Sequence, residues 1–361
     1  MRFLIAGLVL IFLGISLTEY SRRSGATAGG TDSGDGASAK GKPGLPPKVA
    51  RLLEVTPPDL SDEPAAPDAT NALLSSLKTK GDAVEGFSPL LSGPFTARHL
   101  RAGFGYAVVA LDVGEGSTLL RLEPGSPARI IALRKRRLTA LTLDASTLFF
   151  AEGGRVFSTS TRGDAPVLPR ASFKNAVVTA LAAWGDDVLA ALAPADAPDS
   201  PDGAVVRIDS AGEVTLLASD QRRPRAVVTD GKEAFWVADG LWRASVDGSF
   251  SSRIAEGADG PLALDGDAVV ATFGGEVKRM SRAGGKSQTL AEAHATALVA
   301  TSGLTRYATD ESPARLFEVT AGAAPTLAAT LPGKVSALAL GGATLFALGQ
   351  DASGTPVLWA K

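Results

Sequence analysis

The sequence contains no cysteine and very little histidine or asparagine, with two residues of each among 361. Without cysteine the chain can form no disulfide, thiolate zinc site, cysteine nucleophile or acylated lipoprotein anchor. Histidine metal sites usually bring two or three imidazoles together, so His99 and His294 are a poor basis for one. A strong charge is also missing, because 36 basic and 38 acidic residues give a formal net charge of −2. That balance produces no general attraction to nucleic acid or to acidic substrates.

One long apolar run stands at the amino-terminal end. Arg2 precedes residues 3–17, fifteen positions without a charged side chain, which is typical of an export signal. A helix of that length spans roughly 22 Å, less than the ~30 Å hydrocarbon core of a membrane, and this favours a signal peptide. The nearby small-x-small motif at 26–28 lies well beyond the run, which favours a retained anchor. We therefore predict that residues 1–20 are a signal peptide or membrane anchor and that the main domain is exported, to the periplasm or another extracytoplasmic site.

Residues 21–79 are rich in glycine, serine, proline and aspartate, as in GGTDSGDGASAKGKPGLPP. Such a segment buries too little apolar surface to offset the entropy lost on ordering. We predict a disordered, flexible linker that becomes stiffer where proline accumulates. Within it, TNALLSSLK at 70–78 is the one stretch that favours a short helix of one or two turns.

From about residue 96 one pattern recurs, with four short apolar or aromatic runs separated by turns rich in glycine and aspartate. Its anchoring apolar residues lie 35 to 46 positions apart, at Leu100, Leu141, Leu181, Val227, Leu262, Leu298 and Leu338. That spacing, with four β-rich runs in each unit, is typical of a propeller blade. The Asp-Gly pairs at 230–231, 239–240, 247–248 and 265–266 supply the positive φ angles that two-residue hairpins need. We predict an all-β, seven-bladed β-propeller over residues 80–361, with a six-bladed ring containing one degenerate unit as the alternative.

The repeats resemble the bacterial propeller repeats related to the YWTD and NHL classes. Phe149-Phe150, Phe235-Trp236 and Leu345-Phe346 occupy the position of the aromatic second strand. The Gly-x-Val-x-Arg of residues 275–279, followed by Gly284-Gly285, resembles the third strand and its turn. The resemblance covers roughly residues 96–361, and it implies a scaffold whose motifs include no catalytic residues.

The last unit is shorter than the others and ends at a third strand, PVLWA. Propellers usually remove the exposed edge that this leaves by taking a strand from the other end of the chain. The candidate is residues 82–92, DAVEGFSPLLS. We therefore predict that this segment pairs with Val357–Ala360 and closes the ring.

Two stretches of blade five contain fragments of known ligand sites. The GKS at 285–287 lacks the first glycine of a phosphate loop, since that position is Met280. The acidic run that starts at Asp265 has Val269 where a calcium loop needs an oxygen ligand. Both fragments fall where hairpins need glycine and aspartate, so we interpret them as turns.

An enzymatic alternative is a metal-dependent hydrolase or lactonase with its site in the central channel. Propellers similar to gluconolactonase and regucalcin hold a divalent metal there with Glu, Asn and Asp. In this chain the polar candidates on the inner strands are Arg101, Thr142 and Thr229, and none is a carboxylate. We therefore assign no catalytic residue, no metal ligand and no cofactor.

One charge asymmetry remains, in the segments that join the fourth strand of one blade to the first strand of the next. Those of the first three blades form what we call the basic arc: Arg134, Lys135, Arg136, Arg137, Arg170, Lys174, Arg222, Arg223 and Arg225. The next two segments contain Glu256, Asp259 and Glu292 instead. Such an arc attracts an anionic partner, for example an acidic protein segment, a polysaccharide or lipid headgroups. We predict a monomeric, non-catalytic binding or scaffolding propeller of the cell envelope that binds no nucleic acid; a mainly structural module of a larger envelope complex is a further alternative.

Overall fold

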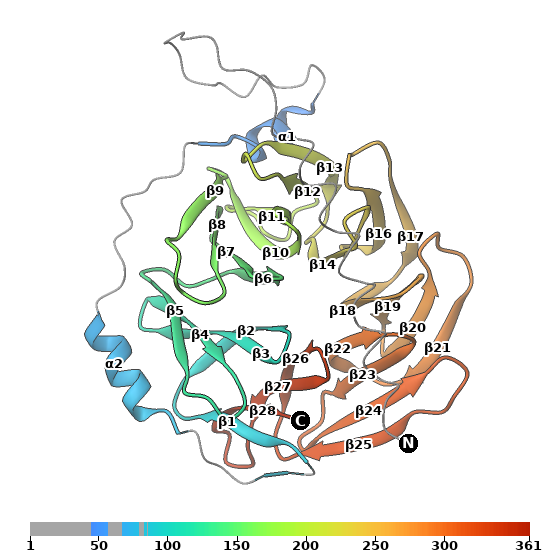
Figure 1. Cartoon of the computed structure of the whole chain (residues 1–361). Coiled ribbons are helices and arrows are strands. Elements are labelled where there is room, and N and C mark those ends of the chain that lie inside the picture. Colours follow the sequence, from blue (N-terminus) through green and yellow to red (C-terminus); the bar gives the residue numbers. More distant parts are fainter. Residues whose placement is uncertain (1–44, 57–66, 79–82, 85) are drawn as a thin grey trace, which may run out of the picture. The chain divides into compact units, whose positions relative to one another are not determined.

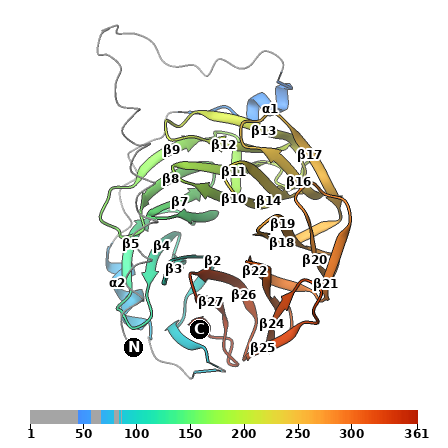
Figure 2. The same cartoon turned by 45° about the vertical axis from the view of Figure 1, so that its right-hand side comes forward.

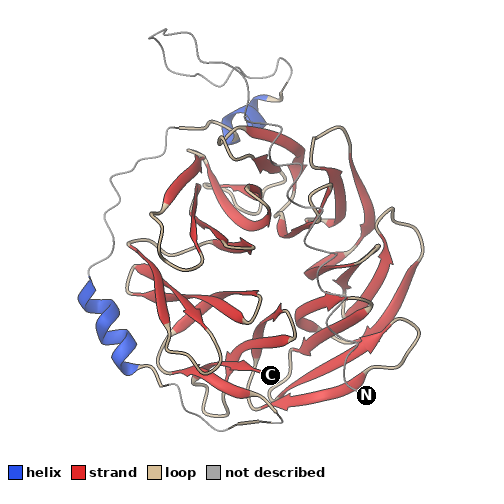
Figure 3. Cartoon of the chain, viewed as in Figure 1, coloured by secondary structure: helices blue, strands red, loops and turns tan. Residues whose placement is uncertain are grey.

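The structure, a computed structural model, describes residues 45–56, 67–78, 83–84 and 86–361. Strands dominate the described chain and form seven antiparallel sheets of four strands each (Figures 1 and 3). The innermost strand of each sheet contacts the innermost strand of the next, and the last contacts the first, so that the sheets form a closed ring. The protein is therefore a seven-bladed β-propeller, as the repeats predict, and the six-bladed alternative is wrong.

Six blades are built from consecutive strands. Blade 1 contains β2 (Thr96–Gly103), β3 (Tyr106–Val113), β4 (Gly116–Leu122) and β5 (Arg129–Arg134). Blade 2 contains β6 (Ala140–Asp144), β7 (Thr147–Glu152), β8 (Arg155–Ser160) and β9 (Leu168–Ser172). Blade 3 contains β10 (Ala176–Trp184), β11 (Asp187–Pro194), β12 (Gly203–Ile208) and β13 (Val214–Gln221).

The second half of the ring repeats this arrangement. Blade 4 contains β14 (Arg225–Thr229), β15 (Glu233–Val237), β16 (Gly240–Ser245) and β17 (Ser251–Glu256). Blade 5 contains β18 (Ala258–Asp265), β19 (Ala268–Phe273), β20 (Glu276–Ser281) and β21 (Ser287–Glu292). Blade 6 contains β22 (Ala295–Thr301), β23 (Leu304–Thr309), β24 (Ala314–Thr320) and β25 (Thr326–Leu331). The seven anchoring residues of the repeat all lie on innermost strands and are buried.

Blade 7 joins the two ends of the propeller. Its first three strands are β26 (Val335–Gly341), β27 (Thr344–Gln350) and β28 (Pro356–Ala360), and its fourth is β1 (Ser88–Ser92). β1 runs antiparallel to β28, with Ser88 opposite Ala360 and Leu91 opposite Leu358. It lies within the segment from which the sequence predicts the closing strand. The pairing covers the edge that β28 would otherwise expose.

The hydrophobic core is divided among the interfaces between neighbouring blades. Among the described residues, seven clusters of buried apolar side chains are found, one for each pair of adjacent blades. The cluster between blades 7 and 1 includes Leu91 of β1 together with Leu100 and Phe346. Phe87, just before β1, is fully buried in the cluster between blades 6 and 7. The closing segment therefore contributes to two of the seven interfaces.

Polar contacts between the hairpin turns connect the blades as well. Asp265, at the end of β18, is buried; it accepts a hydrogen bond from the Gly303 backbone N–H of blade 6 at 2.6 Å and one from Arg279 Nε at 3.0 Å. Asp144 accepts the N–H of Gly185 in the same way, between blades 2 and 3. The start of the acidic run in blade 5 is thus a contact within and between blades, in agreement with its interpretation as a turn.

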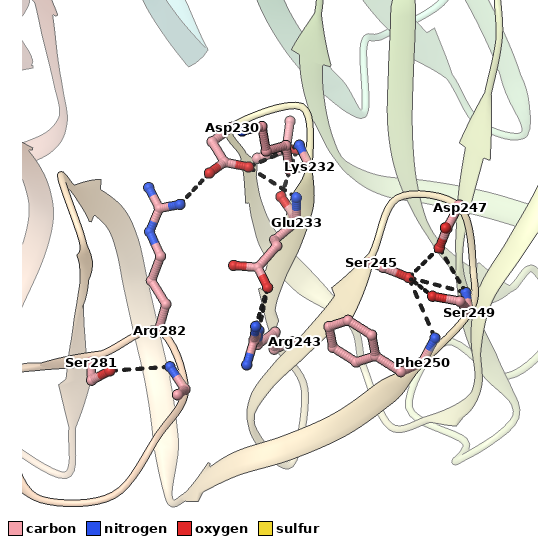
Figure 4. Close-up of polar contacts among 12 residues, drawn as sticks. Asp230, Lys232, Glu233, Arg243, Ser245, Asp247, Ser249, Phe250, Ser281 and Arg282 are labelled. Carbon is pink, nitrogen blue, oxygen red and sulfur yellow. Dashed lines mark hydrogen bonds and ion pairs between the residues drawn. The ribbon is translucent and has the colours of Figure 1, made fainter.

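Two further turns with an aspartate lie in blade 4 (Figure 4). Asp230 accepts the backbone N–H groups of Lys232 and Glu233, each at 2.9 Å, and forms an ion pair with Arg282 of blade 5. Burial alone would raise the pKa of the Asp230 carboxyl, but these donors outweigh it and the pKa is lowered. In the turn after β16, the Ser245 hydroxyl and the Ser249 N–H donate to Asp247 and lower its pKa to about 2. Local backbone hydrogen bonding therefore accounts for these turn carboxylates.

Two helices lie in the range that the sequence assigns to a linker. α1 (Pro47–Leu52) lies beside β12, and its residues Val49 and Leu52 are buried (Figures 1 and 2). α2 (Pro67–Ser76) overlaps the stretch expected to be helical, and Leu73 packs against the cluster between blades 7 and 1. In the part of the chain that the structure describes, no helix has the length and apolar character needed to cross a membrane. The predicted signal or anchor segment lies outside the described residues.

Candidate functional site

The basic arc belongs to one of the two faces of the propeller. Because neighbouring strands of a blade run in opposite directions, the end of the fourth strand, the start of the first, and the turn between the second and third share one edge. We call the surface that these segments form the connection face. The turns between first and second strands, and between third and fourth strands, form the opposite surface, the hairpin face. A partner that binds the arc would therefore approach the connection face.

Arg134 is buried beneath the connection face, with 6% of its surface exposed. Its guanidinium forms an ion pair with Glu152 and lies 4.6 Å from the ring centroid of Phe157. Arg155 donates to the second oxygen of the same carboxylate at 2.8 Å. A buried charge with these partners stabilises the interface between blades 1 and 2 and is not available to a partner.

Arg170 points away from the rest of the arc, toward the hairpin face of blade 3. Its Nη2 donates to the backbone carbonyl oxygens of Asp186 at 2.6 Å and Asp209 at 3.0 Å. Its guanidinium also lies 5.7 Å from the ring centroid of Phe149. Arg170 therefore connects blades 2 and 3.

The middle of the arc is neutralised by carboxylates. Lys174 Nζ lies 3.2 Å from Glu54, which follows α1, and Arg223 Nε lies 2.8 Å from Asp199. Asp199 belongs to the long turn between β11 and β12, which reaches the connection face beside the fourth-to-first connections. Sequence reasoning missed this turn because it considered only the connections between blades. In each repeat the turn between the second and third strands lies on this same face, so acidic residues in that turn, such as Asp199, can be located from the sequence.

Two further groups of cations lie at the ends of the arc. The connection between blades 1 and 2 carries Lys135, Arg136 and Arg137, all exposed. Arg137 donates to the Gly114 carbonyl oxygen at 3.0 Å, so it has no carboxylate partner in this contact. The connection between blades 3 and 4 carries Arg222, which is exposed, and leads into Arg225, which donates to the Asp259 carbonyl oxygen at 2.8 Å. These two connections flank the one on which α1 docks.

α1 and the residues after it dock on the connection between blades 2 and 3. Val55 forms an isolated β-bridge with Phe173, and the Thr56 N–H donates to the Ser172 carbonyl oxygen at 2.9 Å. The Asn175 side chain donates to the Arg51 carbonyl oxygen at 3.1 Å. This segment therefore occupies the middle of the surface that the sequence assigns to a partner. The two prolines at 46 and 47, which favour a helix start, are its only sequence signal.

The central channel is the second candidate site. The innermost strands of all seven blades line a cavity of about 510 Å³. Its walls are leucine, valine, alanine and proline, interrupted by the hydroxyls of Thr142, Thr229, Thr296 and Ser336 and by one charged side chain, Arg101. The three polar candidates of the inner strands therefore do line the channel. Among the described residues, no group of three His, Cys, Asp or Glu side chains is placed to hold a metal ion.

The two histidines do not form a common site. His99 lies on β2 in blade 1, and its Nε2 donates to the Leu138 carbonyl oxygen at 3.3 Å. Burial, and then the neighbouring Arg101 guanidinium, lower the pKa of His99 to about 4. His294 is exposed before β22, against the turn of blade 5 at Gly275. At neutral pH His99 is therefore an uncharged hydrogen-bond donor.

Comparisons with known proteins show the fold alone. No protein family model matches the chain, and no curated protein sequence does. The chain is similar to a chain in the crystal structure of the Mitotic Checkpoint Complex, with a TM-score of 0.60 and 12% identity, over 85% of this chain and 97% of that one. It is similar to the computationally designed Ika8 protein, with a TM-score of 0.50 and 15% identity, over 73% of this chain and 83% of that one. For BamB from Moraxella catarrhalis the TM-score is 0.45 at 12% identity, over 73% and 96% of the two chains.

The protein is thus a β-propeller repeat protein, and its similarity to the YWTD and NHL classes in particular stays a prediction.

Proposed function

We propose that the protein is a non-catalytic binding propeller that holds an anionic partner on its connection face. Lys135, Arg136 and Arg137 would form one contact, and Arg222 with Arg225 the other. Arg134 and Arg170, which have structural partners, would have no part in binding. The partner would therefore span three successive connections and pass over or beside α1.

One observation carries this proposal: Arg136 and Arg222 are exposed on the same face, on the two connections that flank α1, and neither has a carboxylate partner among the described residues. Many other arginines of the connection face, such as Arg223 and Arg253, are paired with acidic side chains. Unpaired guanidinium groups are well suited to carboxylate or phosphate groups, which they bind with two parallel hydrogen bonds.

We propose that the propeller is exported and acts in the cell envelope. Its partner there would be an acidic protein segment or an acidic polysaccharide. Support comes from the apolar run at residues 3–17, which precedes the described residues. Fractionation of cells that produce the full-length protein, with sequencing of its mature amino terminus, tests export and cleavage together. Protein recovered only from the cytoplasmic fraction would contradict this part of the proposal.

The binding experiment measures retention of the full-length protein on two polyanions, polyglutamate and heparin, with neutral dextran as the reference. We expect retention that weakens as salt rises from 50 to 500 mM, because exposed charges are screened over about 10 Å at 0.1 M salt. The triple variant Arg136→Ser, Arg137→Ser, Arg222→Ser should lose most of this retention.

A matched control removes three exposed cations from the hairpin face: Arg162→Ser, Lys232→Ser, Lys286→Ser. It changes the net charge by the same amount as the test variant. If the two variants lose retention equally, general charge and not the connection face binds the polyanion, and the proposal is wrong.

A further inference from the structure

The central channel contains a charge that the fold does not neutralise. Arg101 lies on β2, lines the channel and is half-buried. Its one hydrogen bond among the described residues is donated by Nη1 to the carbonyl oxygen of the adjacent Leu100, at 2.8 Å. A guanidinium has five N–H donors, so most of its hydrogen-bonding capacity remains available.

Other half-buried arginines of the blades differ from Arg101 because they form ion pairs. Arg207 and Arg243 on third strands and Arg306 on a second strand each form an ion pair with a carboxylate of their own blade. No carboxylate in the described part of the chain pairs with Arg101, and none lines the channel. Burial lowers the pKa of the Arg101 guanidinium, with no acidic neighbour to oppose the effect. The surroundings of Arg101 are therefore those of a cation that lacks its anion.

The rest of the channel suits an apolar molecule. Leucine and valine side chains from several inner strands, among them Leu181, Val227 and Leu298, form the wall around a cavity of about 510 Å³. That volume is within the range of small-molecule sites in proteins, roughly 300–1,000 Å³. A ligand that fits this channel would place one anionic group against Arg101 and its apolar atoms against the leucine and valine side chains.

Two exposed aromatic side chains lie at the hairpin end of the same inner strands. Phe104, directly after β2, is 91% exposed, and Trp184, the last residue of β10, is 57% exposed. Each lies over the first turn of another blade: Trp184 is close to Gly231, where an added Cβ would lie 2.3 Å from the indole nitrogen, and Phe104 is close to Gly342. Apolar rings at this end would favour the entry of an apolar ligand.

We propose that the central channel binds a small amphipathic carboxylate, whose carboxylate pairs with Arg101 and whose hydrocarbon part contacts the leucine and valine side chains of the inner strands. The guanidinium fork holds a carboxylate through two parallel hydrogen bonds. The hydroxyls of Thr142 and Thr229 line the same channel and provide additional donors. This site is distinct from the connection-face residues of the proposed function and does not depend on them.

The test compares three probes on the full-length protein by calorimetric titration: octanoate, the uncharged octanamide, and acetate. Octanoate should bind at least about tenfold more tightly than octanamide, because a charge-assisted hydrogen bond contributes about that factor or more. Acetate should bind weakly, since it lacks the hydrocarbon chain. Equal binding of octanoate and octanamide, or no binding of octanoate, overturns the proposal.

Two variants separate binding from folding. Arg101→Met keeps much of the side-chain volume, and it should abolish the preference for octanoate without lowering the melting temperature, because it removes an unpaired charge from an apolar site. Arg98→Met, on the same strand but exposed and paired with Asp112, is the control and should bind octanoate as the wild type does. If Arg101→Met unfolds, Arg101→Lys tests the same preference, since it keeps the charge but loses the planar fork. An Arg101→Met protein that still prefers octanoate shows that Arg101 is not the anion site.

The histidine content provides a second, independent readout. Since His99 and His294 are the only histidines, the imidazole region of an NMR spectrum contains two sets of signals, which His294→Gln assigns. Arg101 lowers the pKa of His99, so a carboxylate bound to Arg101 should raise it above about 4. The His294 signals should not change on addition of octanoate. Binding detected by calorimetry without a change at His99 would place the ligand elsewhere and contradict the assignment.

Discussion

Arg282 of blade 5 reaches across to blade 4 and forms an ion pair with Asp230, whose other oxygen accepts two backbone N–H groups of its own turn (Figure 4). Both side chains are about three-quarters buried, with 22% and 25% of their surfaces exposed. The guanidinium also lies 5.9 Å from the ring centroid of Phe235. Asp230 therefore stabilises its own hairpin turn and also connects blades 4 and 5.

We expect Arg282→Met to lower the free energy of unfolding by about 1 kcal/mol, because the pair is only partly shielded from water. Asp230→Asn should cost a similar amount, since its amide oxygen still accepts the two backbone N–H groups. Urea unfolding of the two single variants and the double variant gives the coupling energy. Strictly additive losses would mean that the pair contributes nothing to the contact between blades 4 and 5.

The closing segment gives a second prediction. Phe87 is fully buried between blades 6 and 7, so Phe87→Ala should lower the free energy of unfolding by about 3–5 kcal/mol. Phe104→Ala is the matched control: it removes the same side chain from a position that is 91% exposed, and it should change stability by less than about 0.5 kcal/mol. Urea unfolding measures both. Similar stabilities for the two variants would show that the segment before β1 does not contribute to ring closure.

The repeat explains why the sequence predicts the fold well. An apolar residue on each innermost strand, such as Leu100 or Leu338, recurs every 35 to 46 positions, because each interface between blades needs the same buried position. The missing fourth strand of the last unit follows from the same regularity, since an open edge needs a partner. The sequence also predicts that carboxylates such as Asp265 belong to hairpin turns, and the hydrogen bond that Asp265 accepts from the next blade adds to that role.

The sequence predicts the residues of the basic arc less well than it predicts the fold, because it does not show in which direction each side chain points. Sequence position places Arg134 and Arg170 at the end of a fourth strand, but successive side chains of a strand point to opposite faces, and these two turn toward neighbouring blades. The acidic turn at Asp199 and the docked α1 lie on the same face by folding and are distant in sequence. The sequence shows that Arg101 is a polar residue of an inner strand, but only the assembled ring shows that no carboxylate of the described residues lines the channel beside it.

The buried position of Arg134 leads to a third prediction. Arg134→Met should lower the free energy of unfolding by about 3 kcal/mol, because it leaves the buried Glu152 carboxylate with less compensation. Arg136→Met, two residues later and exposed, should have almost no effect on stability. The proposed function requires the opposite order in polyglutamate retention, measured on protein shown to be folded. If Arg134→Met is as stable as Arg136→Met, the pair with Glu152 does not stabilise the protein.

His99 gives the pH dependence of stability. Burial is the main reason that its pKa is lowered from 6.5 to about 4, and Arg101 and Arg98 lower it further, while the hydrogen bond to the Leu138 carbonyl and the Asp112 carboxylate act in the opposite direction. Between pH 6.5 and pH 4 the unfolded chain binds a proton at this position that the folded chain does not. The contribution of His99 to stability is therefore complete above pH 6.5 and is lost as the pH falls toward 4.

Urea unfolding at pH 7 and at pH 4 measures this loss, which amounts to at most about 3 kcal/mol for a shift of this size. The variant His99→Gln has no group that titrates in this range, so it should lose less stability on acidification than the wild type. Protonation of carboxylates affects both proteins alike and cancels in the comparison. His294→Gln, at an exposed position, should follow the wild type. Equal losses for wild type and His99→Gln would mean that His99 is as accessible to protons in the folded propeller as in the unfolded chain.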